Sequence, residues 1–110
     1  MTATSITSKD LNTALESNDI ITIIDVRKKP AFDASPETLP QATWQIFDQV
    51  EQWSVNLSSE IKANKVVVYC VHGHEVSQNA AIALTKLGFN ASYLEGGIAS
   101  WVEQGYLLSE

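Results

Sequence analysis

The chain has 110 residues, the usual size of one domain, and its 45% hydrophobic and 18% charged residues are typical of a folded globular protein. Seven lysines and arginines against thirteen aspartates and glutamates give a net charge of −6, which argues against an extended nucleic-acid or anionic-membrane surface. The single cysteine excludes an internal disulfide and a cysteine-rich zinc site. Because the first six residues also lack the features of a signal peptide, we expect one cytoplasmic domain over residues 1–110 that binds neither nucleic acid nor membrane.

The first predicted element is a helix that begins after Thr7 and ends near Asn18. Thr7 is a good N-cap residue, and Asp10 follows three residues later, as in a capping box. The run Ile20–Val26 then predicts a strand. Because this run is apolar on both faces, we expect an inner strand of a parallel sheet.

Three prolines predict turns between residues 27 and 40, around a short helix at Ala31–Ala34. The stretch Phe47–Ile61 is predicted to be helical, because its apolar residues fall roughly on one stripe. That stripe consists of Phe47, Val50, Trp53 or Ser54, Leu57 and Ile61.

The second half of the chain alternates regularly between strands and helices. Strands are predicted at Val66–Tyr69 and Ala91–Leu94, and helices at Val76–Leu87 and Ile98–Gln104. The first of these helices should end at Gly88 and turn Ala80, Ala81, Leu84 and Leu87 inward. This alternation predicts an α/β fold, with a parallel sheet and helices on both of its faces.

The most informative segment is the loop that follows the strand Val66–Tyr69 and starts with Cys70. Ligands bind at the carboxyl edge of such sheets, and the N-terminus of the next helix favours an anion. This position favours the thiolate of Cys70, and Gly73 allows the backbone to turn its amides inward. The loop therefore predicts a cradle for an anionic sulfur species, and a buried structural cysteine is the alternative.

Two histidines, His72 and His74, lie in the same loop. A His-x-His pair with one cysteine and no nearby set of carboxylates is a weak metal pattern, so we predict no metal and no cofactor. The histidines are better interpreted as modulating the charge around the thiolate.

Three separated motifs carry a family resemblance, strongest over residues 20–105. They are Ile23–Arg27, the loop Cys70–Glu75 with its following helix, and Tyr93–Trp101 with its Gly96-Gly97 pair. The sequence of these motifs, the order in which they occur and the spacing between them resemble those of the rhodanese (sulfurtransferase) superfamily. The resemblance is specifically to a stand-alone single-domain member.

The resemblance implies a five-stranded parallel sheet and a nucleophilic Cys70 that carries sulfur as a persulfide. The sulfur would pass from a donor such as thiosulfate to cyanide or a thiol, or between protein partners. Asp25 would organise the neighbouring strand end, Arg27 would pair with a carboxylate, and the Gly96-Gly97 pair would serve packing. The backbone amides that would hold the anion are those of Val71, His72, Gly73, His74, Glu75 and Val76.

Several positions depart from the family pattern. Within Glu37–Ala42 only the aliphatic-Pro-x-Ala part of a family segment is kept. Glu75 stands where many members place a cation or a hydroxyl, so it repels thiosulfate and opposes the thiolate, unless it points outward as a first-turn helix residue. We expect Lys28 or Lys29 to supply the missing positive potential, with a solvated loop as the alternative.

Three other functions compete with a sulfurtransferase. A related phosphatase or arsenate reductase needs a longer loop that ends in arginine, where this chain has Val76 and Ser77. A non-catalytic interaction module is favoured by Glu75 but opposed by Cys70 and Gly73. A sulfur carrier between partner proteins fits the motifs equally well, and the acidic surface would suit a basic partner.

Overall fold

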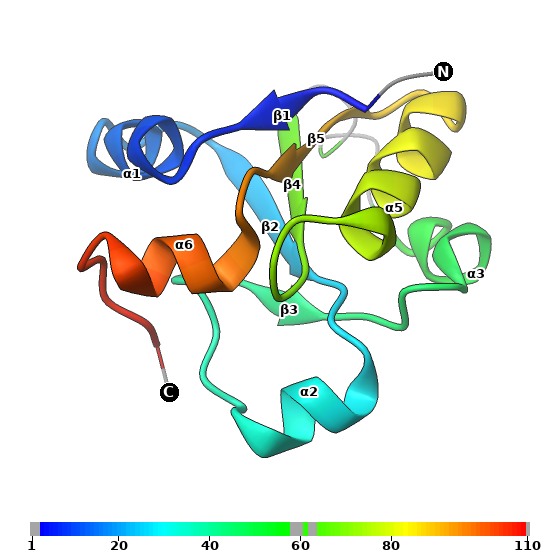
Figure 1. Cartoon of the computed structure of the whole chain (residues 1–110). Helices are drawn as coiled ribbons and strands as arrows, with labels where there is room; N and C mark the ends of the chain where they lie inside the picture. Colours follow the sequence, from blue (N-terminus) through cyan, green and yellow to red (C-terminus); the bar gives the residue numbers. More distant parts are fainter. Residues whose placement is uncertain (1–2, 58–60, 62–63, 110) are drawn as a thin grey trace.

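The computed structural model describes residues 3–57, 61 and 64–109, which form a five-stranded parallel sheet with strand order β1-β5-β4-β2-β3 (Figure 1). The strands are β1 (Ser5–Ile6), β2 (Ile21–Asp25), β3 (Thr43–Trp44), β4 (Lys65–Tyr69) and β5 (Asn90–Leu94). The α/β class and the five-stranded parallel sheet are confirmed. The central strand β4 and its neighbour β2 are in register from Ile21 opposite Lys65 to Asp25 opposite Tyr69.

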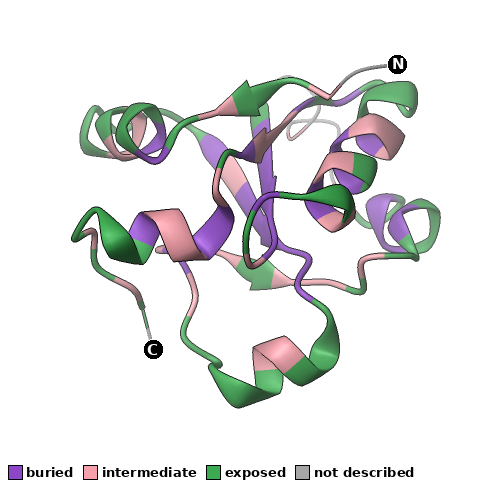
Figure 2. Cartoon of the chain, in the orientation of Figure 1, coloured by how far each residue is buried: buried purple, intermediate pink, exposed green. Residues whose placement is uncertain are grey.

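Helices cover both faces of the sheet, as predicted (Figure 1). They are α1 (Ser8–Glu16), α2 (Lys29–Ala34), α3 (Val50–Ser54), α5 (Glu75–Lys86) and α6 (Gly97–Glu103). On one face Ile24 and Val68 pack with Leu84 of α5, and on the other Ile23 packs with Trp101 of α6. Figure 2 shows β2 and β4 built largely from buried residues, which is the environment that their apolar sequences demand.

The expected helix ends are mostly correct. The hydroxyl of Thr7 accepts a hydrogen bond of 3.1 Å from the backbone N–H of Asp10, so the predicted N-cap of α1 is confirmed. At the end of α5, Gly88 takes the left-handed φ of 95° that follows many helices. Leu87 was wrongly expected to point inward: it is the C-cap of α5 and is 37% exposed, because the helix ends before it turns back to the core.

The prediction of a continuous helix over Phe47–Ile61 is wrong in its extent. Helix α3 covers only Val50–Ser54, because Gln49 has non-helical backbone angles and the hydrogen bonds at its end join residues three apart rather than four. The apolar stripe nevertheless packs against the core through Phe47 and Leu57 as well as through α3. Residues 58–60 lie outside the described part of the chain.

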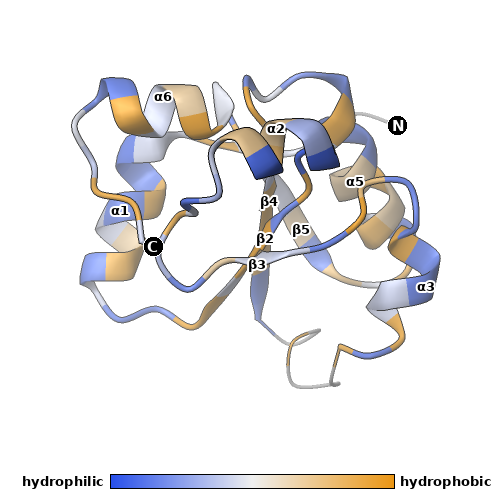
Figure 3. Cartoon of the chain, turned by 90° about the horizontal axis from the view of Figure 1, so that it is seen from below, coloured by the Kyte–Doolittle hydropathy of each residue, from blue (hydrophilic) through white to orange (hydrophobic). Residues whose placement is uncertain are grey.

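The carboxyl ends of β2 and β4 lie together at the lower edge of the sheet in Figure 1. The loop of residues 71–74 leaves β4 at this edge, and α2 follows β2. Seen from below, α2 lies in front of the strand ends, with α6 to its left and α5 to its right (Figure 3). Among the described residues no helix is long and apolar enough to span a membrane, and the cytoplasmic location stays a prediction.

Candidate functional site

Cys70 lies where the sequence predicts, directly after the last residue of β4 and at the carboxyl edge of the sheet. Cys70 is buried, with 7% of its surface exposed to solvent. The sulfur lies 3.1 Å from the hydroxyl oxygen of Ser77, which is itself fully buried in the first turn of α5. The thiol therefore lies where β4 ends and the loop begins, and the first turn of α5 places a hydroxyl group in contact with it.

The cysteine loop, residues 70–76, is held through several of its carbonyl groups, while its N–H groups after Cys70 make no hydrogen bond among the described residues. The carbonyl oxygens of Cys70 and Val71 accept hydrogen bonds of 3.0 Å each from α6, and the carbonyl of Gly73 accepts one from the Gln78 side chain. Within the described residues no hydrogen bond takes up the backbone N–H groups of residues 71–76. Such a run of unfilled donors before a helix N-terminus is suited to hold an anion.

The Gly96-Gly97 turn presses directly on this loop, a contact that the sequence analysis did not predict. A Cβ atom on Gly97 would lie 2.5 Å from the carbonyl oxygens of both Cys70 and Val71. A Cβ atom on Gly73 would lie 2.7 Å from the backbone nitrogen of Gly96. All three glycines also have a positive φ, so neither the space nor the backbone admits a side chain there. The glycine pair therefore packs directly against the cysteine loop.

At the neighbouring strand end, Arg27 pairs with a carboxylate, which the structure identifies as that of Asp25. The Arg27 guanidinium lies 2.7 Å from the Asp25 carboxylate, and both side chains are buried. Arg27 also donates to the carbonyl oxygens of Ser35 and Glu37, at 2.9 and 3.0 Å. One guanidinium therefore fastens the segment after α2 to the end of β2.

Tyr69 completes this network from the adjacent strand. Its hydroxyl donates to Asp25 at 3.1 Å and accepts from the backbone N–H of Leu39 at 3.2 Å. Burial raises the pKa of the Tyr69 hydroxyl well above its ordinary value of 10.0, and the Asp25 carboxylate raises it further. The residue before the cysteine is thus held in its neutral, hydrogen-bonded form.

The charged residues near the cysteine loop are exposed. Glu75 is in the first turn of α5, and the side chain of Lys28 lies over the ring of Phe47, with Nζ 5.4 Å from its centroid. Lys28, Glu75 and Val76 line one pocket of about 290 Å³. Lys29 instead pairs with Asp33 on its own helix at 3.2 Å. The structure therefore brings Lys28, rather than Lys29, to the pocket that Glu75 lines.

His72 and His74 are both exposed, with ring centroids 6.0 Å apart. Within the described chain, no group of three or more histidine, cysteine, aspartate or glutamate residues is arranged to hold a metal ion. On the other flank of the loop, Val71 lines an apolar pocket of about 380 Å³ together with residues of α2 and α6. Residues of the loop therefore line two pockets, one of which is lined by charged side chains and the other mainly by apolar ones.

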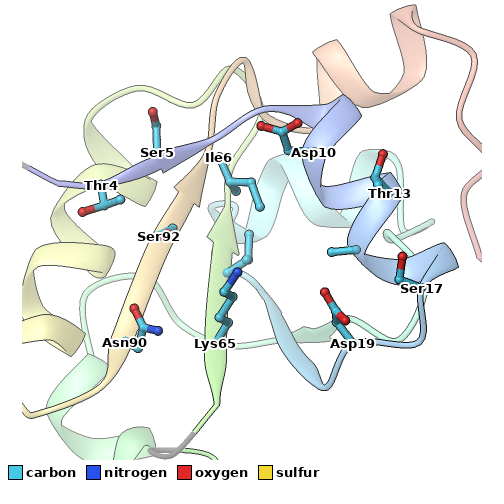
Figure 4. A pocket seen from close by; sticks show the side chains of 12 residues that line it. Thr4, Ser5, Ile6, Asp10, Thr13, Ser17, Asp19, Lys65, Asn90 and Ser92 are labelled. Atoms are coloured by element: carbon cyan, nitrogen blue, oxygen red, sulfur yellow. The ribbon is translucent and has the colours of Figure 1, made fainter.

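A larger pocket, of about 600 Å³, lies away from the cysteine loop (Figure 4). Lys65 and Asn90, the first residues of β4 and β5, line it together with hydroxyl and carboxylate side chains of α1 and β1. It therefore opens near the amino ends of these two strands. None of the predicted site residues lines it, and its size alone does not make it the functional site.

Comparisons with known proteins identify the family to which this fold belongs. A model of the rhodanese-like domain matches residues 7–104. The adenylyltransferase and sulfurtransferase UBA4 of Yarrowia lipolytica is 30% identical over 83 residues, which cover 74% of this chain but only 19% of that protein. The chain therefore spans a small part of that relative's length.

Solved structures show the same fold. A rhodanese-related protein from Thermoplasma volcanium has a TM-score of 0.78 and 28% sequence identity, with 96% of both chains covered. A thiosulfate sulfurtransferase from Pseudomonas aeruginosa has a TM-score of 0.81 over 98% of this chain and 19% of that one. At 21% identity, the second likeness shows the fold alone.

The protein has an open parallel sheet with a cysteine loop at its carboxyl edge. This makes it an α/β domain with a thiol at the end of a strand, where such sheets bind ligands. The family match over residues 7–104 goes one step further. The chain belongs to the rhodanese-like domain family, which is related to sulfurtransferases.

Proposed function

We propose that this protein is a sulfurtransferase that carries sulfane sulfur on Cys70, with thiosulfate as a donor and cyanide or a thiol as the acceptor. The observation that carries the proposal is the thiol at the start of a loop whose six backbone N–H groups, on residues 71–76, have no hydrogen-bond partner among the described residues. An anionic sulfur chain at Cys70 needs such donors, and a structural cysteine does not.

In the first half-reaction the Cys70 thiolate attacks the outer sulfur of thiosulfate. A new sulfur–sulfur bond forms, the bond within thiosulfate breaks, and sulfite leaves with its electron pair. In the second half-reaction cyanide or a thiolate attacks the outer sulfur of the persulfide, and Cys70 leaves as a thiolate. Both steps conserve charge and need no metal, cofactor or external oxidant.

The loop amides would hold the negative charge in both steps, because it stays on sulfur throughout. Lys28 would attract the donor anion at the mouth of the pocket that it lines with Glu75. Glu75 acts in the opposite direction, so the proposal includes weak activity on thiosulfate. The exposed carboxylate would favour a basic protein partner as the physiological donor or acceptor.

Thiocyanate formation from thiosulfate and cyanide tests this proposal. The wild type should form thiocyanate, and Cys70→Ser should form none while it unfolds at the same urea concentration. Thiocyanate formation by Cys70→Ser would refute the mechanism. If neither form is active, a protein persulfide should be offered next, and failure to accept sulfur from it as well would leave an interaction module.

A further inference from the structure

Ser77 is a buried polar residue that the mechanism above does not use. Its side chain is 0% exposed, and its hydroxyl oxygen lies 3.1 Å from the Cys70 sulfur. Across the described residues no other hydrogen bond involves this hydroxyl. Ser77 therefore contacts the reacting atom and little else that is polar.

The local geometry explains why this hydroxyl is available. A serine or threonine inside a helix usually bonds the carbonyl four residues back, as Thr85 does with Ala81 at 2.8 Å. For Ser77 that carbonyl belongs to Gly73, and the Gln78 side chain occupies it at 3.0 Å. The Ser77 hydroxyl makes no bond to this carbonyl and is paired with the Cys70 sulfur instead.

We propose that Ser77 is a second catalytic residue, whose hydroxyl donates a hydrogen bond to the Cys70 sulfur whenever that sulfur is an anion. The inference rests on the persulfide function proposed above. In the neutral state the thiol donates to the serine oxygen. After the thiol loses its proton, the hydroxyl rotates and donates to the thiolate, which is the stronger, charge-assisted form of the bond.

This hydrogen bond affects the two half-reactions differently. In the persulfide the negative charge is on the outer sulfur, so the Cys70 sulfur is nearly neutral. When the acceptor takes the outer sulfur, the sulfur–sulfur bond breaks and its electron pair returns to the Cys70 sulfur. Ser77 then stabilises the leaving thiolate and speeds this step. In the first step it stabilises the attacking thiolate in the ground state, so it gives no acceleration there.

Single-turnover kinetics of Ser77→Ala separate the two steps. At a pH where Cys70 is ionised, thiosulfate should charge the variant at least as fast as the wild type, because the variant lacks the hydrogen bond that stabilises the attacking thiolate. Cyanide should discharge its persulfide about tenfold more slowly, the size expected for one hydrogen bond to a charged group. Ser54→Ala is the matched control, because Ser54 is also buried, but its hydroxyl bonds the Glu51 carbonyl on α3. It should match the wild type in both steps.

Alkylation by iodoacetamide provides a readout that needs no sulfur transfer. The pH at which the alkylation rate of Cys70 reaches half its maximum should be higher in Ser77→Ala than in the wild type or Ser54→Ala. If the wild type forms the persulfide, two results overturn the proposal. One is that Ser77→Ala loses its outer sulfur to cyanide at the wild-type rate, and the other is that both steps are slowed equally. If neither thiosulfate nor a protein persulfide charges the wild type, the persulfide function fails, and an unchanged alkylation midpoint then rejects the role of Ser77 separately.

Discussion

The backbone N–H of Ile98 donates a hydrogen bond of 3.0 Å to the carbonyl oxygen of Cys70, so the last helix holds the first residue of the cysteine loop. The next N–H along, that of Ala99, holds Val71 in the same way. The start of the cysteine loop and the start of α6, which are far apart in the sequence, therefore form one unit. The shape of the cysteine loop depends on the close approach of the Gly96-Gly97 turn.

The first prediction concerns Gly97, whose replacement should damage stability and sulfur transfer together. Gly97→Ala places a methyl group 2.5 Å from the Cys70 carbonyl at a φ of 63°, and we expect a loss of about 2–4 kcal/mol in the free energy of unfolding. Urea denaturation measures this loss. Gly105→Ala is the control: its φ of 86° is also positive, but nothing lies within 4 Å. Equal losses in both variants would show that the contact with the loop is unimportant.

Replacement of Glu75 should increase activity on thiosulfate. Glu75→Gln removes a like charge beside the incoming anion, and we expect kcat/KM for thiosulfate to rise roughly two- to fivefold, the range for one exposed charge. The gain should shrink at high salt, because the charge is exposed to solvent. Glu103→Gln, an exposed carboxylate on α6, should change nothing. An equal gain from both variants would mean that net charge alone is responsible.

Lys28 and Lys29 should differ although they are neighbours. Lys28→Gln should raise the KM for thiosulfate about twofold, as expected for one solvent-exposed charge. Lys29→Gln should not, because Lys29 pairs with Asp33 and does not line the pocket with Glu75. Steady-state kinetics at low salt measures both. An unchanged KM in the two single variants and in the double variant would remove the lysines from the account.

The buried network at the end of β2 should make the free energy of unfolding depend on pH in the alkaline range. Tyr69 ionises at a higher pH in the folded chain than in the unfolded chain. Its contribution is therefore fully present below its ordinary pKa of 10.0 and is lost as the pH rises above that value through the folded pKa. Tyr69→Phe should lower the free energy of unfolding by about 1–3 kcal/mol near neutral pH, because Asp25 and the Leu39 N–H lose a partner.

In the same variant the decline of stability above pH 10.0 should be shallower than in the wild type. Urea denaturation over a pH series measures the slope. Tyr93→Phe is the control, since Tyr93 is only partly buried. A wild-type slope in Tyr69→Phe would contradict the assignment.

The sequence predicted the elements with strong local patterns. The apolar runs before Asp25 and Cys70 became adjacent inner strands, because each carries buried side chains on both faces. The family motif implied a carboxylate partner for Arg27, and only the structure shows that this partner is Asp25. The apolar stripe from Phe47 to Leu57 predicted which residues contact the core, but it did not predict the backbone conformation. A chain of successive turns can bury apolar residues at the same spacing as a helix.

The contacts at the site were less accessible from the sequence. The approach of Gly97 to the Cys70 carbonyl joins distant segments, and two consecutive glycines signalled only that some close approach exists. Ser77 received no role, because its contact with the sulfur depends on how tightly the loop turns before α5. Glu75 and Lys28 have opposite charges and are both exposed, so each should change the activity on thiosulfate by only a small factor.

The central claim is that Cys70 carries transferable sulfur, and the intact mass of the protein after incubation with excess thiosulfate tests it most directly. The account predicts a gain of one sulfur atom, reversed by cyanide and absent in Cys70→Ser. A gain of the same mass by Cys70→Ser, or a gain that cyanide does not reverse, would contradict it.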